Sequence, residues 1–185
     1  MELSQNQQES EKPITISISI PTNAYFMSGI RDFTFSLIKN MTQFSEQWAY
    51  RFQAVVDELS NNAIEHGSKK DEHITIIFTA EPQKSIQIAV EDTGTGPEKL
   101  NAEQMKKLVA ERSQPGYPFT EIRGRGLAKI VAAWTDELKF EDLPNGGLRV
   151  SVKKLLKQEA NAATQGQQRA QASFEKQDPT HVVLS

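Results

Sequence analysis

The chain contains the stretch Val55-Val56-Asp57-Glu58-Leu59-Ser60-Asn61-Asn62-Ala63-Ile64-Glu65-His66-Gly67. Its apolar residues recur at intervals of three and four, the spacing of a helix face that packs against a core. Glu58, Asn62 and His66 are each four residues apart, so we expect them to form a stripe beside that face. Gly67 can take a positive φ and end the helix. Alone, the stretch also fits a half-buried helix with a solvated edge.

Composition excludes several classes of protein. The chain has 185 residues, a net charge of −3 and no cysteine. A net negative charge does not indicate binding to nucleic acid or to an anionic membrane, both of which attract positively charged proteins. Without cysteine there is no disulfide framework and no thiolate nucleophile, and the 3 histidines make a histidine metal cluster unexpected. No apolar run approaches the roughly 20 residues of a membrane span, and the N-terminus lacks the pattern of a signal peptide. We therefore expect a cytoplasmic protein.

Hydrophobic periodicity predicts a chain of alternating strands and helices. Period-two alternation predicts strands at 14–20, at 73–80, at 85–91 and on both sides of an Asn-Gly turn at 144–147. Helical spacing predicts helices at 23–40, at 45–66 and from Gly126 to Trp134, with a weaker helix at 102–109. We expect residues 1–12 to be disordered, 13–155 to form one domain and 156–185 to be a polar tail.

A second motif, Asp92-x-Gly94-x-Gly96, follows the strand at 85–91. A carboxylate at this place can accept a hydrogen bond from an exocyclic amine such as that of adenine. Gly94 has no Cβ, so a flat ring can approach the backbone, and Gly96 can act as a hinge for the long segment after it. Alone, the motif also fits an ordinary glycine-rich turn.

A third motif, Gly124-Arg125-Gly126-Leu127, enters the helix predicted from Gly126. Such an entry leaves backbone N–H groups free for phosphate oxygens, and Arg123 or Arg125 would add positive charge. A flexible helix start with solvated arginines fits equally well. The motif is not the phosphate loop of P-loop proteins, because no Gly-Lys-Ser/Thr follows it. It is not the dinucleotide-binding fingerprint either, because its spacing differs and the expected lid, not a strand, precedes it.

In this order, the three motifs resemble the ATP-binding domain of the GHKL superfamily, which includes gyrase, the Hsp90 chaperone, histidine kinases and MutL-type proteins. Within it, the fuller motif Glu58-x-x-x-Asn62-Ala63-Ile64-x-His66-Gly67 resembles the small anti-sigma-factor serine kinases. The resemblance covers about Ile14 to Lys154. It implies a two-layer α/β sandwich with a mixed, mostly antiparallel sheet and helices on one face, and an ATP lid at about 97–123.

The resemblance also implies roles for individual residues. Asn62 would ligate Mg²⁺, and Glu58 would orient or deprotonate the attacking hydroxyl. Asp92 would read adenine, and His66 would be structural. The implied ATP-binding residues are Asn62, Asp92, Gly94, Gly96, Arg123, Gly124, Arg125, Gly126 and Leu127. In one respect the chain departs from the family, which commonly has a threonine after the last hairpin glycine. Here Leu148 follows Gly147, so that adenine contact is missing or water-mediated.

Three functions follow as hypotheses. The resemblance implies an ATP-dependent protein serine/threonine kinase that sequesters a sigma factor and phosphorylates the antagonist protein that would release it. Relatives often dimerise, so a homodimer is allowed. The first alternative is a nucleotide-dependent sequestration module without transfer activity, which the departure at Leu148 favours. The second is a detached histidine-kinase catalytic domain, which would need a separate phospho-accepting helix pair.

Overall fold

The computed structural model describes residues 12–114, 126–128 and 134–156. In this part, the chain forms a sheet of 5 strands in the order β1-β2-β3-β5-β4. The strands are β1 (Ile14–Pro21), β2 (His73–Glu81), β3 (Ser85–Glu91), β4 (Glu137–Asp142) and β5 (Leu148–Leu155). The predicted two-layer α/β fold is confirmed. All four described strand pairings are antiparallel, so the sheet is not mixed within these residues.

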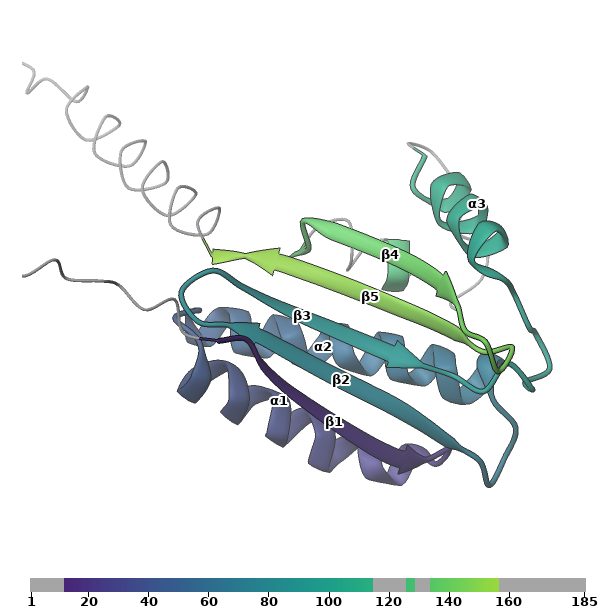
Figure 1. Ribbon diagram of the computed structural model, residues 1–185, viewed down its shortest axis with the longest axis horizontal. Coiled ribbons are helices and arrows are strands. Elements are labelled where there is room, and N and C mark those ends of the chain that lie inside the picture. Colours follow the sequence, from purple (N-terminus) through teal and green to yellow (C-terminus); the bar gives the residue numbers. More distant parts are fainter. Residues whose placement is uncertain (1–11, 115–125, 129–133, 157–185) are drawn as a thin grey trace, which may run out of the picture.

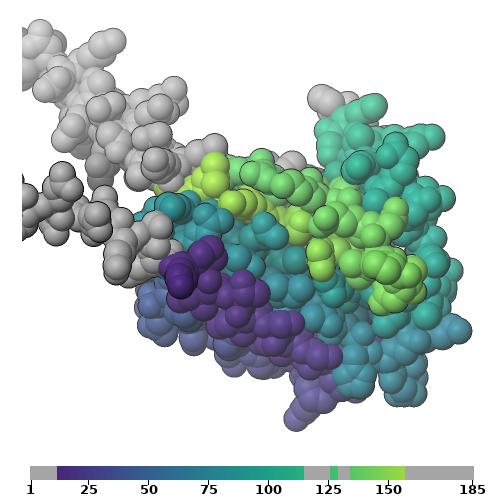
Figure 2. Space-filling view, in the orientation of Figure 1, coloured from purple at the N-terminus to yellow at the C-terminus, as the bar shows by residue number. Residues whose placement is uncertain are grey.

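Two long helices cover one face of the sheet (Figure 1). A short 3₁₀ turn, η1 (Ala24–Phe26), leads into α1 (Met27–Met41), and α2 (Glu46–Asn62) continues into a π-helical turn, η2 (Ala63–Gly67). No described helix covers the opposite face, which is turned to the viewer in Figure 2. The described helices also lack the length and hydropathy that a membrane span requires. The predicted N-terminal segment and tail lie outside the described residues, apart from Lys12 and Leu156.

The core lies between the helices and the sheet. Alternate strand residues form apolar rows across the sheet, and one row pairs Ile16 with Phe78, Phe78 with Ile88 and Ile88 with Val152. Phe78, Ile88 and Val152 are at most 1% exposed, as is Phe52 of α2. Burying a side chain of this kind contributes about 1.5–3 kcal/mol. The period-two strands and the helical stripe of α2 therefore turn their apolar sides towards each other.

A shorter helix, α3 (Ala102–Arg112), stands apart from this helix layer and lies beside β4 (Figure 1). Asn101 caps it: its Oδ1 accepts from the N–H of Gln104 at 2.8 Å, and the Gln104 side chain accepts from the Asn101 N–H at 2.9 Å. The N–H of Ala102 also donates to Asp142 at the end of β4, at 2.8 Å. The weak helix predicted at 102–109 is confirmed and extends to Arg112. Of the helix predicted at Gly126–Trp134, only 126–128 and 134 are described, and these are helical.

Candidate functional site

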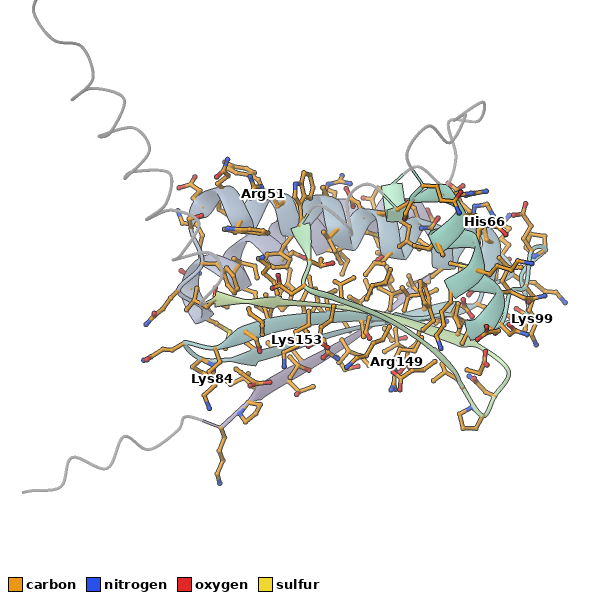
Figure 3. The ribbon with its side chains drawn as sticks, turned by 90° about the horizontal axis from the view of Figure 1, so that it is seen from above. Arg51, His66, Lys84, Lys99, Arg149 and Lys153 are labelled. Atoms are coloured by element: carbon orange, nitrogen blue, oxygen red, sulfur yellow. The ribbon has the colours of Figure 1, made fainter. Side chains whose placement is uncertain are left out.

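A cavity of about 650 Å³ opens where β3 ends and β5 begins. This volume lies within the range of small-molecule sites. Figure 3 shows two of its lining residues, His66 and Lys99, at the same end of the molecule, opposite the end that carries Arg51 and Lys84. The walls come from the end of α2 with η2, the end of β3 and the segment after it, α3, residues 127–128 and the start of β5. They include Asn62, His66, Asp92, Gly94, Lys99, Met105, Leu108, Arg112, Leu127, Leu148 and Val150.

Asp92 is the half-buried carboxylate of this cavity. Its Oδ1 accepts hydrogen bonds from the backbone N–H groups of Gly94 and Leu148, each at 2.9 Å. Burial raises the pKa of the Asp92 carboxyl, and these two N–H groups together with the charge of Lys99 offset part of the rise. Within the described residues, Oδ2 has no hydrogen-bond donor. Asp92 is therefore oriented through one oxygen and can receive a ligand's donor through the other.

Glycines allow the backbone to pack closely around Asp92. A Cβ on Gly67 would overlap the Asp92 carboxylate, and a Cβ on Gly147 would overlap the Asp92 carbonyl. Gly94 has φ +66°, and a Cβ there would meet the carbonyl of Gly146. Gly67, Gly94 and Gly147 therefore lie close together around Asp92, although they are far apart in the sequence.

The end of α2 carries the predicted base and the predicted magnesium ligand. The Nδ2 of Asn62 donates to Oε1 of Glu58 at 3.1 Å, which places the two side chains in contact. His66 follows in the π-turn η2, and its side chain lines the same cavity as that of Asn62. Its Nδ1 lies 3.2 Å from Oε2 of Glu98. Of the three side chains expected on one stripe, Glu58 and Asn62 are in contact, and His66 also has a partner after β3.

The start of the predicted lid is bound to the end of the helix. The N–H of Gly96 donates to the carbonyl of Gly67 at 3.1 Å, and that of Glu98 donates to the carbonyl of His66 at 3.3 Å. A Cβ on Gly96 would overlap the His66 carbonyl, so Gly96 is required for this close approach. The structure describes the lid as far as residue 114.

The expected ATP lid at about 97–123 includes α3, but the sequence singled out no residue of this helix as a site residue. Met105, Leu108 and Val109 line the cavity from this helix, together with Arg112 one turn later. Their spacing of three and four was the available signal, but in a short polar helix it did not single out the residues that face the cavity. Lys99 was also missed, and it is the cation that acts on Asp92.

The third predicted motif is described only in part, because Arg123, Gly124 and Arg125 lie outside the described residues. Gly126 packs directly against Glu58, since a Cβ there would overlap the Glu58 carboxylate. Leu127 is 5% exposed and lines the cavity. Among the predicted site residues that are described, the cavity lining includes Asn62, Asp92, Gly94 and Leu127, and it leaves out Glu58, Gly96 and Gly126.

The profile of the histidine kinase-like ATPase domain matches residues 20–154, more than half of the chain. The chain belongs to this family. The predicted superfamily is thereby confirmed, whereas the finer resemblance to anti-sigma-factor kinases stays a prediction. Histidine kinase-like ATPase domains bind ATP, generally with Mg²⁺. None of the curated proteins compared with the chain matches it.

The donor set of this ATPase domain fits a magnesium ion that is held mainly by its substrate. Within the described residues, no group of 3 or more His, Asp or Glu side chains could hold a metal. Asn62 uses Nδ2 to bind Glu58, which leaves its Oδ1 for a hard cation. Mg²⁺ commonly takes one or two protein oxygens and completes its shell with phosphates and water. Asn62 would therefore hold the ion together with the ATP phosphates.

Proposed function

We propose that this protein is an ATP-dependent serine/threonine kinase that acts as an anti-sigma factor in the cytoplasm. It holds a sigma factor and phosphorylates a serine or threonine of a small antagonist protein, and the unphosphorylated antagonist releases the sigma factor. The supporting observation is the contact between Glu58 and Asn62 at 3.1 Å, with Asn62 and Asp92 lining one cavity. A candidate base, a candidate magnesium ligand and a candidate adenine acceptor thus come together.

Adenine recognition would rest on Asp92. The Oδ2 of its carboxylate would accept from the exocyclic 6-amino group, while Oδ1 keeps its two backbone donors. The apolar side chains of Leu148 and Val150, with those of α3, would contact the ring. A flat base in an apolar slot with one directional acceptor is the usual arrangement of a cofactor site.

Glu58 would accept the proton of the attacking hydroxyl. The hydroxyl oxygen then forms a bond to the γ-phosphorus while the bond from that phosphorus to its bridging oxygen breaks, and ADP leaves with the electron pair. The Mg²⁺ bound through Asn62 would neutralise charge on the phosphates. Gly126, which packs on the Glu58 carboxylate, would bring the start of the helix predicted at Gly126–Trp134 close to the reacting groups.

Leu148 favours a second candidate, a nucleotide-dependent sequestration module without transfer. Its N–H is bound to Asp92, and its side chain is 6% exposed in the cavity wall. An apolar side chain offers no hydroxyl to adenine, so one hydrogen bond of about 0.5–1.5 kcal/mol is absent. Weaker binding of this kind would suit a switch that responds to nucleotide concentration and does not turn over.

Incubation with γ-labelled ATP and candidate antagonist proteins tests the kinase directly. We expect label on a serine or threonine of one antagonist, stable in acid. An acid-labile phosphohistidine would instead support a detached histidine-kinase domain. ATP binding without label on any partner would support the sequestration module.

Replacing Asn62 by Ala is expected to abolish the magnesium dependence of ATP binding. Loss of the amide removes the candidate ligand for the ion, and calorimetric titration with ATP, with and without Mg²⁺, measures the effect. The matched control is Asn61→Ala, which removes the same group from the neighbouring position of α2. Equal magnesium dependence in wild type and Asn62→Ala would contradict the assigned role.

A further inference from the structure

Glu72 lies in the connection between η2 and β2, outside the three sequence motifs, and it has no part in the proposed mechanism. Its Oε2 accepts hydrogen bonds from the hydroxyls of Thr93 and Thr95, each at 2.5 Å, and from the N–H of Lys69 at 3.1 Å. The N–H of Lys69 also points to the Thr95 hydroxyl at 3.2 Å. One carboxylate oxygen therefore gathers three donors from two separate segments.

The two threonines are the intervening residues of the Asp92-x-Gly94-x-Gly96 motif. Asp92 and Gly94 line the cavity, whereas the hydroxyls of Thr93 and Thr95 both bind Glu72. Successive residues of the loop therefore face the cavity and the Glu72 carboxylate in turn. A further bond, from the N–H of Thr93 to the hydroxyl of Ser68 at 3.2 Å, joins the backbone to the same connection.

Charge reinforces this arrangement. The hydroxyls of Thr93 and Thr95 hold the pKa of Glu72 below its ordinary value, with a smaller contribution from Lys69. Glu72 is therefore ionised at neutral pH, and hydrogen bonds to an ionised acceptor are shorter and stronger than neutral ones. The hydroxyls of Thr93 and Thr95 lie 2.8 Å apart, so a single oxygen can serve both.

We propose that Glu72 is a positioning residue for base recognition: it holds the loop after β3 through Thr93 and Thr95, so that Asp92 meets the exocyclic amine of the nucleotide. This inference rests on the proposed nucleotide site. Asp92 is flanked by Thr93 and lies only two residues from Gly94, its own backbone donor. A shift of this loop would move the carboxylate of Asp92 without unfolding the sheet.

Comparing the affinities of two nucleotides distinguishes a positioning role of Glu72 from a purely structural one. Purine riboside triphosphate lacks the 6-amino group, so the ratio of its Kd to that of ATP reports what this group, the proposed partner of Asp92, contributes to binding. In wild type we expect a ratio on the order of 10 to 100. In Glu72→Ala we expect the ratio to fall about tenfold or more towards 1, mainly through weaker ATP binding.

Control variants make the comparison specific. Glu81→Ala removes a carboxylate at the opposite end of β2, where Glu81 pairs with Lys153 at 3.2 Å, and it should keep the wild-type ratio. Thr93→Val should lower the ratio and Thr93→Ser should restore it, because serine keeps the hydroxyl. These threonine variants decide the question even if Glu72→Ala fails to fold.

Four outcomes would overturn the inference. They are an unchanged ratio in folded Glu72→Ala, an unchanged ratio in Thr93→Val, an equal fall in Glu81→Ala, and a wild type that binds both nucleotides equally well. A wild type that binds neither nucleotide at millimolar concentration would overturn the proposed function itself, which distinguishes the two failures.

Discussion

Glu58→Gln is expected to lower the rate of phosphoryl transfer by about 10²–10⁴-fold, the range for loss of a general base. Glutamine keeps a carbonyl oxygen, which can still accept from Nδ2 of Asn62 as Oε1 of Glu58 does at 3.1 Å. It cannot take the proton of an attacking hydroxyl. We therefore expect Mg²⁺-ATP to bind with close to wild-type affinity while transfer is lost, as measured by calorimetry and by labelled-phosphate assays.

The matched control is Glu65→Gln, which changes an exposed carboxylate on the adjoining turn η2. It should leave both binding and transfer unchanged. Transfer at the full rate in Glu58→Gln would show that the assigned mechanism is wrong. Loss of ATP binding in the same variant would instead assign Glu58 to the support of Asn62 and of Gly126, which packs on its carboxylate.

Asp92→Asn is expected to weaken ATP binding by about 10–100-fold without unfolding the protein, because a hydrogen bond to a charged group contributes about 1.5–3 kcal/mol. The carbonyl oxygen of asparagine can keep the N–H donors of Gly94 and Leu148, which lie 2.9 Å from Oδ1. Its NH₂ group would replace Oδ2 and oppose the amine of adenine. Calorimetry measures the affinity. The matched control, Asp57→Asn, alters another partly buried carboxylate of raised pKa on α2, paired with Arg31, and should bind ATP normally.

The same variant carries a prediction about pH and stability. Because burial raises the pKa of Asp92, its ionisation costs folding free energy at neutral pH. Asp92→Asn should therefore be at least as stable as wild type near pH 7. Its advantage should shrink as the pH falls through the raised pKa, since wild type then regains the proton. Denaturant unfolding at a series of pH values measures this difference, and an advantage that grows on acidification would contradict the burial of Asp92.

Local patterns in the sequence predicted the helix that carries Glu58 and Asn62, the strand that ends before Asp92, and most element boundaries. Such patterns depend only on neighbouring residues, because the side-chain periods of 2.0 in a strand and 3.6 in a helix indicate which face of that element is buried. The π-turn η2 was not predicted, because one added residue in a helical turn leaves no mark in a stripe of mixed polarity. Nor did the sequence indicate that His66 pairs with Glu98, which follows β3.

By itself, the sequence determined the α/β alternation, the family of ATPase domains and the three segments expected to bind nucleotide. Only the tertiary structure decided which surfaces meet. It places β5 between β3 and β4, packs Gly126 on Glu58, and brings Glu72 against Thr93. Such contacts join residues far apart in the chain, and they depend on strand pairing and on the absence of a Cβ at particular points. Periodicity records the burial of each element but not its partner, so the candidate residues of the site could be named from the sequence, whereas their contacts could not.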